Sequence, residues 1–390
     1  MIPRTIFSPE HDSFRASVRR FVETELKPHH AQWEDAGQVP REIWRKAGAA
    51  GLLCCSVAEE YGGPGANFLA GAVVIEELAR GGITGPGFAV HSDMVATYIE
   101  RFGSARQKQR WLPGMVSGEL IGALGITEPG AGSDVRGIRT SVRRDGDMLV
   151  VSGQKTYISN GQLADFVVLA CKSDPARPRD AISLVIVETD RPGFARGRRL
   201  KKLGLKAQDT SELFFDEVRV PADNLIGREH EGFHYLTRNL AHERLVQAVR
   251  SAAVAEVTLE QTVEYTAGRR AFDQTIAEFQ NTQFKLAELK AAIVAARVFV
   301  DRCIELQLVD ALDPVDAAAA KLLLSDLHCR VVDECLQLHG GWGYMWEDPV
   351  CRAYADARIV KIAGGAMEVM KQIIARDMFG SLLRSRRKPA

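Results

Sequence analysis

The sequence predicts an α+β protein in which one β domain separates two helical regions. Apolar residues recur at helical spacing from residue 8 to about 120. From about 121 to 225 the pattern changes to short runs of β-branched and aromatic residues, separated by Gly, Pro, Asp and Asn. Helical spacing returns after Gly232 and continues to the end of the chain. We therefore expect three domains, at residues 1–120, 121–230 and 231–390.

The first helix is expected to begin at Pro9, because Ser8 is a suitable N-cap and proline suits the first helical position. Four apolar residues then recur at helix spacing: Phe14, Val18, Phe21 and Val22. Three more helices are expected, at residues 41–50, 68–79 and 104–115. The glycine clusters at 62–65 and 81–82 mark the breaks between helices.

In the middle region the expected strands are residues 149–151, 165–170, 182–187 and 213–215, and residues 175–180 are expected to form an exposed loop. In the last region one helix is indicated by the spacing of Leu289, Ile293, Ala296 and Val300. Asp313-Pro314 starts another helix, on which we expect Leu323, Leu327 and Val331 to share a face. Residues 384–390 are expected to form a basic tail.

Composition excludes several classes of function. Fifty basic and fifty acidic residues cancel, so no net charge favours capture of nucleic acid or of an anionic membrane. The seven cysteines include no Cys-x-x-Cys pair, so we expect neither a metal site nor a disulfide framework. No apolar signal core begins the chain, and no apolar run approaches the length of a membrane span. A cytoplasmic protein with no spanning helix is expected.

Residues 127–134 (TEPGAGSD) form the first candidate binding motif, where the chain enters the β domain. Small residues let backbone N–H groups approach a ligand closely, and Thr127 and Ser133 add hydroxyl groups. Val135 occupies the third glycine position of a G-x-G-x-x-G fingerprint, so the motif is not a dinucleotide-binding one of that type. Taken alone, it also fits a plain glycine-rich turn.

Two further motifs follow. Residues 155–161 (KTYISNG) alone would fit a strand that ends in an Asn-Gly turn. Residues 269–272 (RRAF), Gln280 and residues 337–344 (QLHGGWGY) offer an arginine pair suited to a diphosphate and glycines that permit close main-chain approach. Taken alone, the glycines also fit a helix C-cap followed by a turn.

Together the three motifs resemble the acyl-CoA dehydrogenase family, and the resemblance runs from Phe7 to Phe379. It is closest to the long-chain branch in four stretches: Pro28-His29-His30, Gln208-Asp209-Thr210, residues 337–346 and Gly364-Gly365. It implies an N-terminal helical domain, a middle β-barrel and a C-terminal four-helix bundle. It also implies FAD lying between barrel and bundle, and a homotetramer, with a dimer as the alternative.

The resemblance also implies roles for single residues. Tyr157 is expected near the face of the flavin ring, and Ser159 at the nitrogen that receives hydride. The full set of expected cofactor contacts is Leu124, Ile126, Thr127, Gly132, Ser133, Tyr157, Ile158, Ser159, Arg269, Phe272, Gln280, Gln337, Leu338, His339, Gly340, Gly341, Ala366 and Glu368. The expected substrate contacts are Ser133, His234, Ala241, Arg244, Gly364 and Gly365.

The base is the most specific expectation. Removing hydrogen from Cα and Cβ of an acyl thioester needs a base and a hydride acceptor, and FAD supplies the acceptor. Short- and medium-chain members carry the base in a stretch matching Ala363 to Ala366, where this chain has Gly364. Long-chain members carry it in a Glu-Arg-Leu stretch, which matches Glu243-Arg244-Leu245. We therefore expect Glu243 to be the base; a solvated helix glutamate is the alternative.

The resemblance implies α,β-dehydrogenation of a long-chain or branched acyl-CoA to the trans-2-enoyl-CoA in fatty acid β-oxidation, with electron-transfer flavoprotein as acceptor. Ala363 and Ala366 replace an aromatic residue and a threonine of the family, and both changes bear on acyl specificity. Two alternatives are a flavin oxidase, which passes electrons to oxygen, and a non-catalytic acyl-CoA-binding scaffold with the same fold.

Overall fold

The computed structural model describes residues 2–174, 176–177 and 181–385. Most of the loop expected at 175–180 and the 386–390 part of the expected tail therefore lie outside the described residues. The chain forms two compact units. We call Met1–Ala16, Ile75–Gly82 and Ala241–Ala390 the helical unit, and Ser17–Val74 with Ile83–Leu240 the mixed unit.

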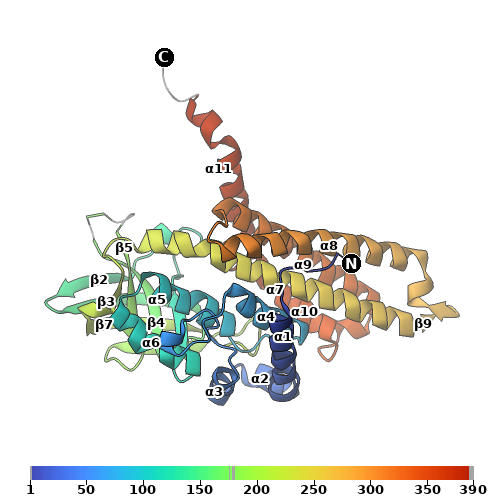
Figure 1. The fold of residues 1–390 in the computed structure, drawn as a ribbon, viewed down its shortest axis with the longest axis horizontal. Coiled ribbons are helices and arrows are strands. Elements are labelled where there is room, and N and C mark those ends of the chain that lie inside the picture. Colours follow the sequence, from blue (N-terminus) through green and yellow to red (C-terminus); the bar gives the residue numbers. More distant parts are fainter. Residues whose placement is uncertain (1, 175, 178–180, 386–390) are drawn as a thin grey trace. The chain divides into compact units, whose positions relative to one another are not determined.

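The expected fold class is confirmed, since helices precede and follow a β region (Figure 1). The three-domain boundaries at 120/121 and 230/231 stay a prediction. No helix in the described part of the chain is long and apolar enough to cross a membrane.

The helices before the sheet are α1 (Pro9–Phe21), α2 (His30–Ala36), α3 (Arg41–Ala49), α4 (Phe68–Arg80), α5 (Ala96–Phe102) and α6 (Ala105–Ser117). The four helices expected before the sheet are found as α1, α3, α4 and α6, whereas α2 and α5 were not predicted. Ser104 caps α6, because its hydroxyl accepts a bond from the Gln107 N–H while the Gln107 side chain accepts one from the Ser104 N–H. Val90–Val95 form a π-helical turn before α5.

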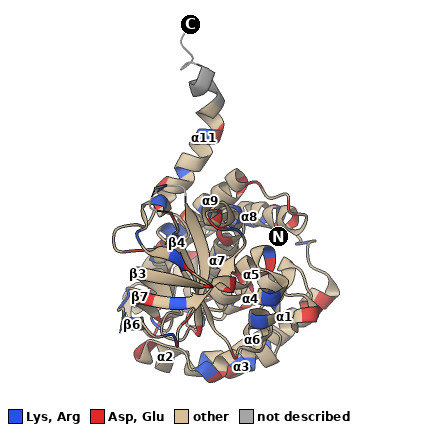
Figure 2. Cartoon of the chain, turned by 90° about the vertical axis from the view of Figure 1, so that its left-hand side faces the viewer, with Lys and Arg blue, Asp and Glu red and all other residues tan. Residues whose placement is uncertain are grey.

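The β region is an eight-stranded sheet in the mixed unit, part of which Figure 2 shows. Its strands are β1 (Gly122–Gly125), β2 (Ser141–Asp145), β3 (Met148–Ser159), β4 (Phe166–Lys172), β5 (Ile182–Glu188), β6 (Phe194–Arg199), β7 (Thr210–Pro221) and β8 (Leu225–Ile226). The order is β6-β7-β3-β2-β4-β5-β8, and β1 pairs with β4 in parallel. The predicted runs lie in strands, except that the run expected from residue 165 begins one residue later, at Phe166 in β4. Strands β4 and β5 are buried along nearly their whole length.

The helical unit contains α7 from Ala241 onward, α8, α9, α10 and α11. Their bounds are α7 (Gly232–Gly268), α8 (Gln280–Leu308), α9 (Pro314–His339), α10 (Pro349–Ala357) and α11 (Met367–Ser385), with a two-strand ribbon of β9 (Arg270–Ala271) and β10 (Gln274–Thr275). Helix α9 packs against α8, α10 and α11 (Figure 1). Asp313 caps α9, as expected, by accepting a 2.7 Å hydrogen bond from the Val315 N–H.

Two expectations for this unit are wrong. Leu323 is 47% exposed, whereas its neighbour Leu324 is buried at 1%. Steps of four residues drift around a helix, and the stripe that runs through Leu324, Leu327 and Val331 is the buried one. The chain is also still helical at residues 384 and 385, where a tail was expected, because α11 ends at Ser385.

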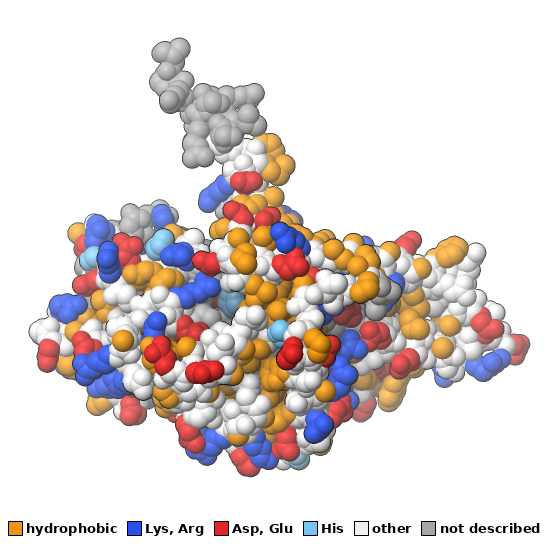
Figure 3. Space-filling model, viewed as in Figure 1, with side chains coloured by type: hydrophobic (Ala, Val, Ile, Leu, Met, Phe, Trp, Pro, Cys, Tyr) orange, Lys and Arg blue, Asp and Glu red, His pale blue; other side chains and the backbone are white. Residues whose placement is uncertain are grey.

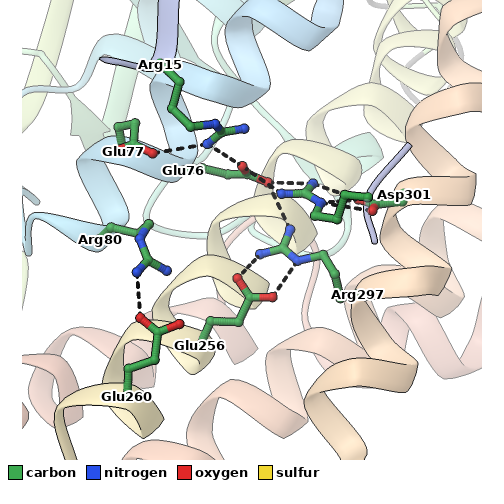
Figure 4. Close-up of polar contacts among 9 residues, drawn as sticks. Arg15, Glu76, Glu77, Arg80, Glu256, Glu260, Arg297 and Asp301 are labelled. Carbon is green, nitrogen blue, oxygen red and sulfur yellow. Dashed lines mark hydrogen bonds and ion pairs between the residues drawn. The ribbon is translucent and has the colours of Figure 1, made fainter. Parts of the chain in front are cut away.

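A cluster of buried ionic residues ties the N-terminal segment into the helical unit (Figure 4). Glu76 on α4 is 3% exposed and pairs with Arg4, Arg15 and Arg297, each at 2.9 Å. Arg297 on α8 also pairs with Glu256 on α7 at 2.6 Å. The guanidinium groups of Arg4 and Arg15 both lie 4.7 Å from the ring centre of Phe7. Residues that lie up to 297 positions apart in the sequence therefore share one cluster.

Candidate active site

The first two motifs lie next to each other in the mixed unit. The Thr156 N–H donates to the Thr127 carbonyl at 2.9 Å. The Lys155 ammonium, which is fully buried, donates to the Ile126 carbonyl at 3.1 Å and to the Glu128 carboxylate at 2.8 Å. Strand β3 is thereby fastened to the segment that follows β1. Sequence reasoning missed this role of Lys155, because nothing local shows which segment a buried lysine reaches.

Glu128 anchors the opposite side of the same motif. Its carboxylate accepts hydrogen bonds from the N–H groups of Arg139 at 2.6 Å and Thr140 at 2.9 Å. Burial alone would raise the pKa of Glu128, but the Lys155 charge and the hydrogen bonds from Lys155 and Thr140 hold it below its usual value. Glu128 therefore stays ionised and fixes the turn between Glu128 and Ala131.

The residues in front of this anchored frame are accessible. Gly132 and Ser133 are exposed, and a Cβ at Gly130 or Gly132 would meet no atom within 4 Å. Leu124, Ile126, Thr127 and Ser159 are partly buried, whereas Ile158 is buried. The glycines of this motif therefore leave open space beside the main chain.

Tyr157 is 68% exposed and has a positive φ of 59°. It lies where the pairing of β3 with β7 shifts register, between Lys155 and Ile158. Such a bulge turns a side chain out of the sheet, and a non-glycine residue at positive φ is strained. The Asn-Gly turn after the strand is present too, since Asn160 has φ 63° and donates to the Gly87 carbonyl at 3.2 Å.

Glu243 lies on α7 in the helical unit and is 5% exposed. The alternative of a solvated helix glutamate is therefore wrong. Ala241 and Arg244 are buried as well, at 7% and 6% exposure. Burial lowers the pKa of the Arg244 guanidinium, although the neighbouring Glu243 opposes that change. The Nε of Arg244 has no hydrogen-bond partner within the described part of the chain.

Ala363 to Ala366, which we call the glycine turn, lies beside α7. Gly364 and Gly365 have φ values of 66° and 94°, which favour glycine. A Cβ at Gly364 would lie 3.6 Å from the Cγ of Gln247, one helical turn after Glu243. The ammonium of Lys321 on α9 donates to the Gly365 carbonyl at 2.5 Å. Gly364, where short- and medium-chain members of the family carry the base, therefore packs against the helix that carries Glu243.

The third motif is also largely accessible. Arg269, Gln280, Gln337, Gly340 and Gly341 are exposed, Phe272 is 87% exposed, Leu338 is partly buried and Glu368 is exposed at the start of α11. His339 differs, because its ring is buried and Nδ1 lies 2.7 Å from the Asp348 carboxylate. The ring also stacks on Tyr265, with ring centres 4.1 Å apart. The His339 side chain thus supports the Gly340-Gly341 turn and is not open to a ligand.

The remaining expected substrate contact, His234, lies exposed on the first part of α7, within the mixed unit. The expected residues therefore fall into two sets. The mixed unit holds the first two motifs and His234, and the helical unit holds Glu243, the glycine turn and the third motif. Lys321 was not anticipated, because the carbonyl it binds lies 44 residues away in the sequence.

Comparison with known proteins identifies this arrangement. Three acyl-CoA dehydrogenase models, for the N-terminal, middle and C-terminal domains, match residues 8–119, 123–218 and 230–379. The chain is 49% identical to the mitochondrial long-chain specific acyl-CoA dehydrogenase of Sus scrofa over 377 residues, which cover 96% of this chain and 88% of that protein.

Solved structures agree. The crystal structure of an acyl-CoA dehydrogenase from Geobacillus kaustophilus matches with a TM-score of 0.94 and 46% identity, covering 96% of this chain and 100% of that one. A glutaryl-CoA dehydrogenase from Mycobacterium smegmatis in complex with FADH2 matches with a TM-score of 0.90 and 30% identity, over 96% of each chain. The chain therefore belongs to the acyl-CoA dehydrogenase family, and it is an oxidoreductase that acts on the CH–CH group of acyl-CoA.

Proposed function

We propose that the protein is an FAD-dependent dehydrogenase of long-chain or branched acyl-CoA, which forms the trans-2-enoyl-CoA in fatty acid β-oxidation, with Glu243 as the base. The observation that carries the proposal is the combination of a buried glutamate on α7 with glycine at position 364. The 49% identity to a long-chain specific relative supports the same assignment.

Glu243 would remove the α-proton of the thioester. A buried carboxylate is a stronger base than an exposed one, because burial disfavours its charged form. No other carboxyl group stands at the alternative position, since residues 363–366 carry nothing larger than a methyl group. We assign Arg244 to the CoA part of the substrate, because its guanidinium is buried and its Nε has no partner among the described residues.

The exposed residues of the motifs fit an FAD molecule. Tyr157 offers an aromatic face, the open space beside Gly130 and Gly132 leaves room for a ligand, and Arg269 offers a cation suited to a diphosphate. When bound, FAD supplies the acceptor for the hydride that leaves the β-carbon. We propose that the residues expected as cofactor contacts bind FAD, except for the ring of His339.

The small side chains of the glycine turn support a long or branched acyl group. Ala363, Gly364 and Ala366 leave space where a larger residue would restrict the ligand. A Cβ built at Gly364 would meet only Gln247 within 4 Å. We therefore propose that the enzyme accepts substituents near the α-carbon as well as long straight chains.

We further propose electron-transfer flavoprotein as the electron acceptor, a homotetramer as the assembly and the cytoplasm as the location. Apolar side chains at the surface of the helical unit support self-association, as Figure 3 shows on one face. In the helical unit, Leu323, Tyr354 and Met378 are 47%, 46% and 60% exposed.

The test is anaerobic reduction of the bound flavin by a panel of saturated acyl-CoAs of different length and branching. We expect long-chain and 2-methyl-branched acyl-CoAs to bleach the flavin and to yield the trans-2-enoyl-CoA. Hydrogen peroxide formed at the turnover rate in air would identify an oxidase instead. Tight acyl-CoA binding by protein that holds no flavin would identify a non-catalytic scaffold and would contradict the proposal.

A further inference from the structure

Lys321 is a buried cation that no expected role explains. It lies on α9, its side chain is 0% exposed, and its ammonium donates to the Gly365 carbonyl at 2.5 Å. Among the described residues this is the only side-chain hydrogen bond to the glycine turn. We propose that Lys321 is a positioning residue, which holds the glycine turn against the part of α7 that carries Glu243. The proposal rests on the function proposed above.

A charged side chain is a poor choice at position 321 if its purpose is only to fill space in the core. Burying an ammonium group carries a large desolvation penalty, and a methionine of similar length would fill the same space without it. The nearby Arg244 charge adds to the penalty, whereas Glu368 relieves part of it. Burial first, and then Arg244, lower the pKa of Lys321 to about 8. A cation kept in such surroundings indicates a specific task, here the bond to Gly365.

The glycine turn needs such a restraint. Two consecutive glycines with positive φ have wide conformational freedom, so the chain alone does not specify one arrangement. Gly364 lies against Gln247, and Gly365 faces Met370, whose Cε would be 2.7 Å from an added Cβ. A shift of the glycine turn would therefore alter the surface that it presents to the part of α7 from Glu243 to Gln247.

Loss of the Lys321 bond should affect the rate of flavin reduction and the affinity for acyl-CoA to different extents. If the glycine turn orients the reacting carbons relative to Glu243, loosening it lowers the maximal rate of flavin reduction more than it weakens acyl-CoA binding. A hydrogen bond from a charged donor is strong enough to change that rate about ten- to a hundredfold. Four of the six expected substrate contacts, Ser133, His234, Ala241 and Arg244, lie outside the glycine turn, so the Kd should change little.

The experiment compares Lys321→Met with Lys361→Met. Lys361 is a matched control, because it also pairs with α9, through Asp326 at 2.7 Å, but is 30% exposed and has no bond to the glycine turn. Two quantities are measured on the FAD-loaded proteins: amide hydrogen exchange of residues 363–367 without ligand, and the kinetics of anaerobic flavin reduction by acyl-CoA. Flavin content and circular dichroism confirm that each variant is folded.

For Lys321→Met we expect exchange in residues 363–367 to be about tenfold faster, a maximal reduction rate about ten- to a hundredfold lower and a Kd within about threefold of wild type. Lys361→Met should match wild type in all three. Lys321→Arg keeps a cationic donor and should restore most of the rate; it also serves as the test variant if Lys321→Met does not fold. If Lys321→Arg is the test variant, the proposal would be overturned by a reduction rate about ten- to a hundredfold lower than that of wild type in a protein whose residues 363–367 exchange as slowly as in wild type.

Unchanged exchange in Lys321→Met, or an unchanged maximal rate, would overturn it as well. Failure of the proposed function has a different signature. In that case wild-type protein is not reduced by any acyl-CoA, while the exchange measurement still shows whether Lys321 restrains the glycine turn.

Discussion

His328 on α9 shows how a single buried side chain makes folding depend on pH. It is 2% exposed, and neither ring nitrogen has a hydrogen-bond partner within the described part of the chain. Burial, together with the nearby Arg250 charge, lowers the pKa of His328 from 6.5 to about 3. The folded protein therefore keeps this ring neutral at pH values where the unfolded chain already binds a proton.

The sign of the effect follows from that difference. As pH falls below 6.5, the unfolded state gains protons that the folded state does not, so the free energy of unfolding decreases. Between pH 7 and pH 5 the loss from His328 is about 2 kcal/mol. Between pH 7 and pH 5 we therefore expect the free energy of unfolding of His328→Met to fall by about 2 kcal/mol less than that of wild type. Urea denaturation at fixed protein and FAD concentrations measures it. His29 is exposed, so His29→Gln serves as the control. The prediction would be refuted if the free energy of unfolding depended on pH equally in His328→Met and in wild type.

Residue identity alone indicated some of the site and missed other parts. Glu243 and Gly364 could be picked from the sequence, because both lie in short stretches that resemble a family pattern. The exposure of Tyr157 could not, because it depends on a register shift between β3 and β7, which are more than fifty positions apart. Lys321 gave no signal either, since its partner is a backbone carbonyl in a distant turn.

At the scale of elements, the pair of Lys155 and Glu128 joins β3 to the first binding motif. Removing one partner of a buried ion pair leaves an uncompensated charge, which costs about 3–5 kcal/mol. We expect Lys155→Met to lose stability in that range and to lose FAD on gel filtration, because the Thr127 to Ser133 segment is no longer held. The measurements are urea denaturation and the ratio of flavin to protein absorbance.

A double variant separates loss of the pair from loss of packing. Lys155→Met with Glu128→Gln removes both charges, so it should recover part of the stability that Lys155→Met loses. The proposed coupling between Lys155 and Glu128 would be contradicted if the double variant lost as much stability as the sum of the losses in Lys155→Met and Glu128→Gln.

Elements with local signals were predictable, and those that depend on distant partners were not. The helix expected at residues 104–115 is α6, and the expected strand runs within 165–170 and 182–187 lie in the buried strands β4 and β5. The face expected to hold Leu323, Leu327 and Val331 is not the buried one, because the neighbouring apolar residues Leu323 and Leu324 fit two different stripes of α9 and only Leu324 is buried. Packing against other helices decides between such stripes.

For the whole molecule, contacts between segments far apart in the sequence are what sequence reasoning could not supply. The pair of Arg4 and Asp301 spans 297 positions at 2.7 Å, so the first sixteen residues belong to the helical unit. The α+β class and the order of helical and β regions were predictable, since each region has its own periodicity. The allocation of the N-terminal segment and of part of α4 to the helical unit depends on the buried ionic cluster.

The central claim is that this enzyme carries its base on α7, at Glu243. Anaerobic flavin reduction by a long-chain acyl-CoA tests it most directly, with Glu264→Gln, an exposed glutamate on the same helix, as the matched control. Because a general base contributes about 10²–10⁴ in rate, we predict that Glu243→Gln binds acyl-CoA but reduces its flavin at least about a hundredfold more slowly, while Glu264→Gln behaves like wild type. Reduction of Glu243→Gln at the wild-type rate would contradict the claim.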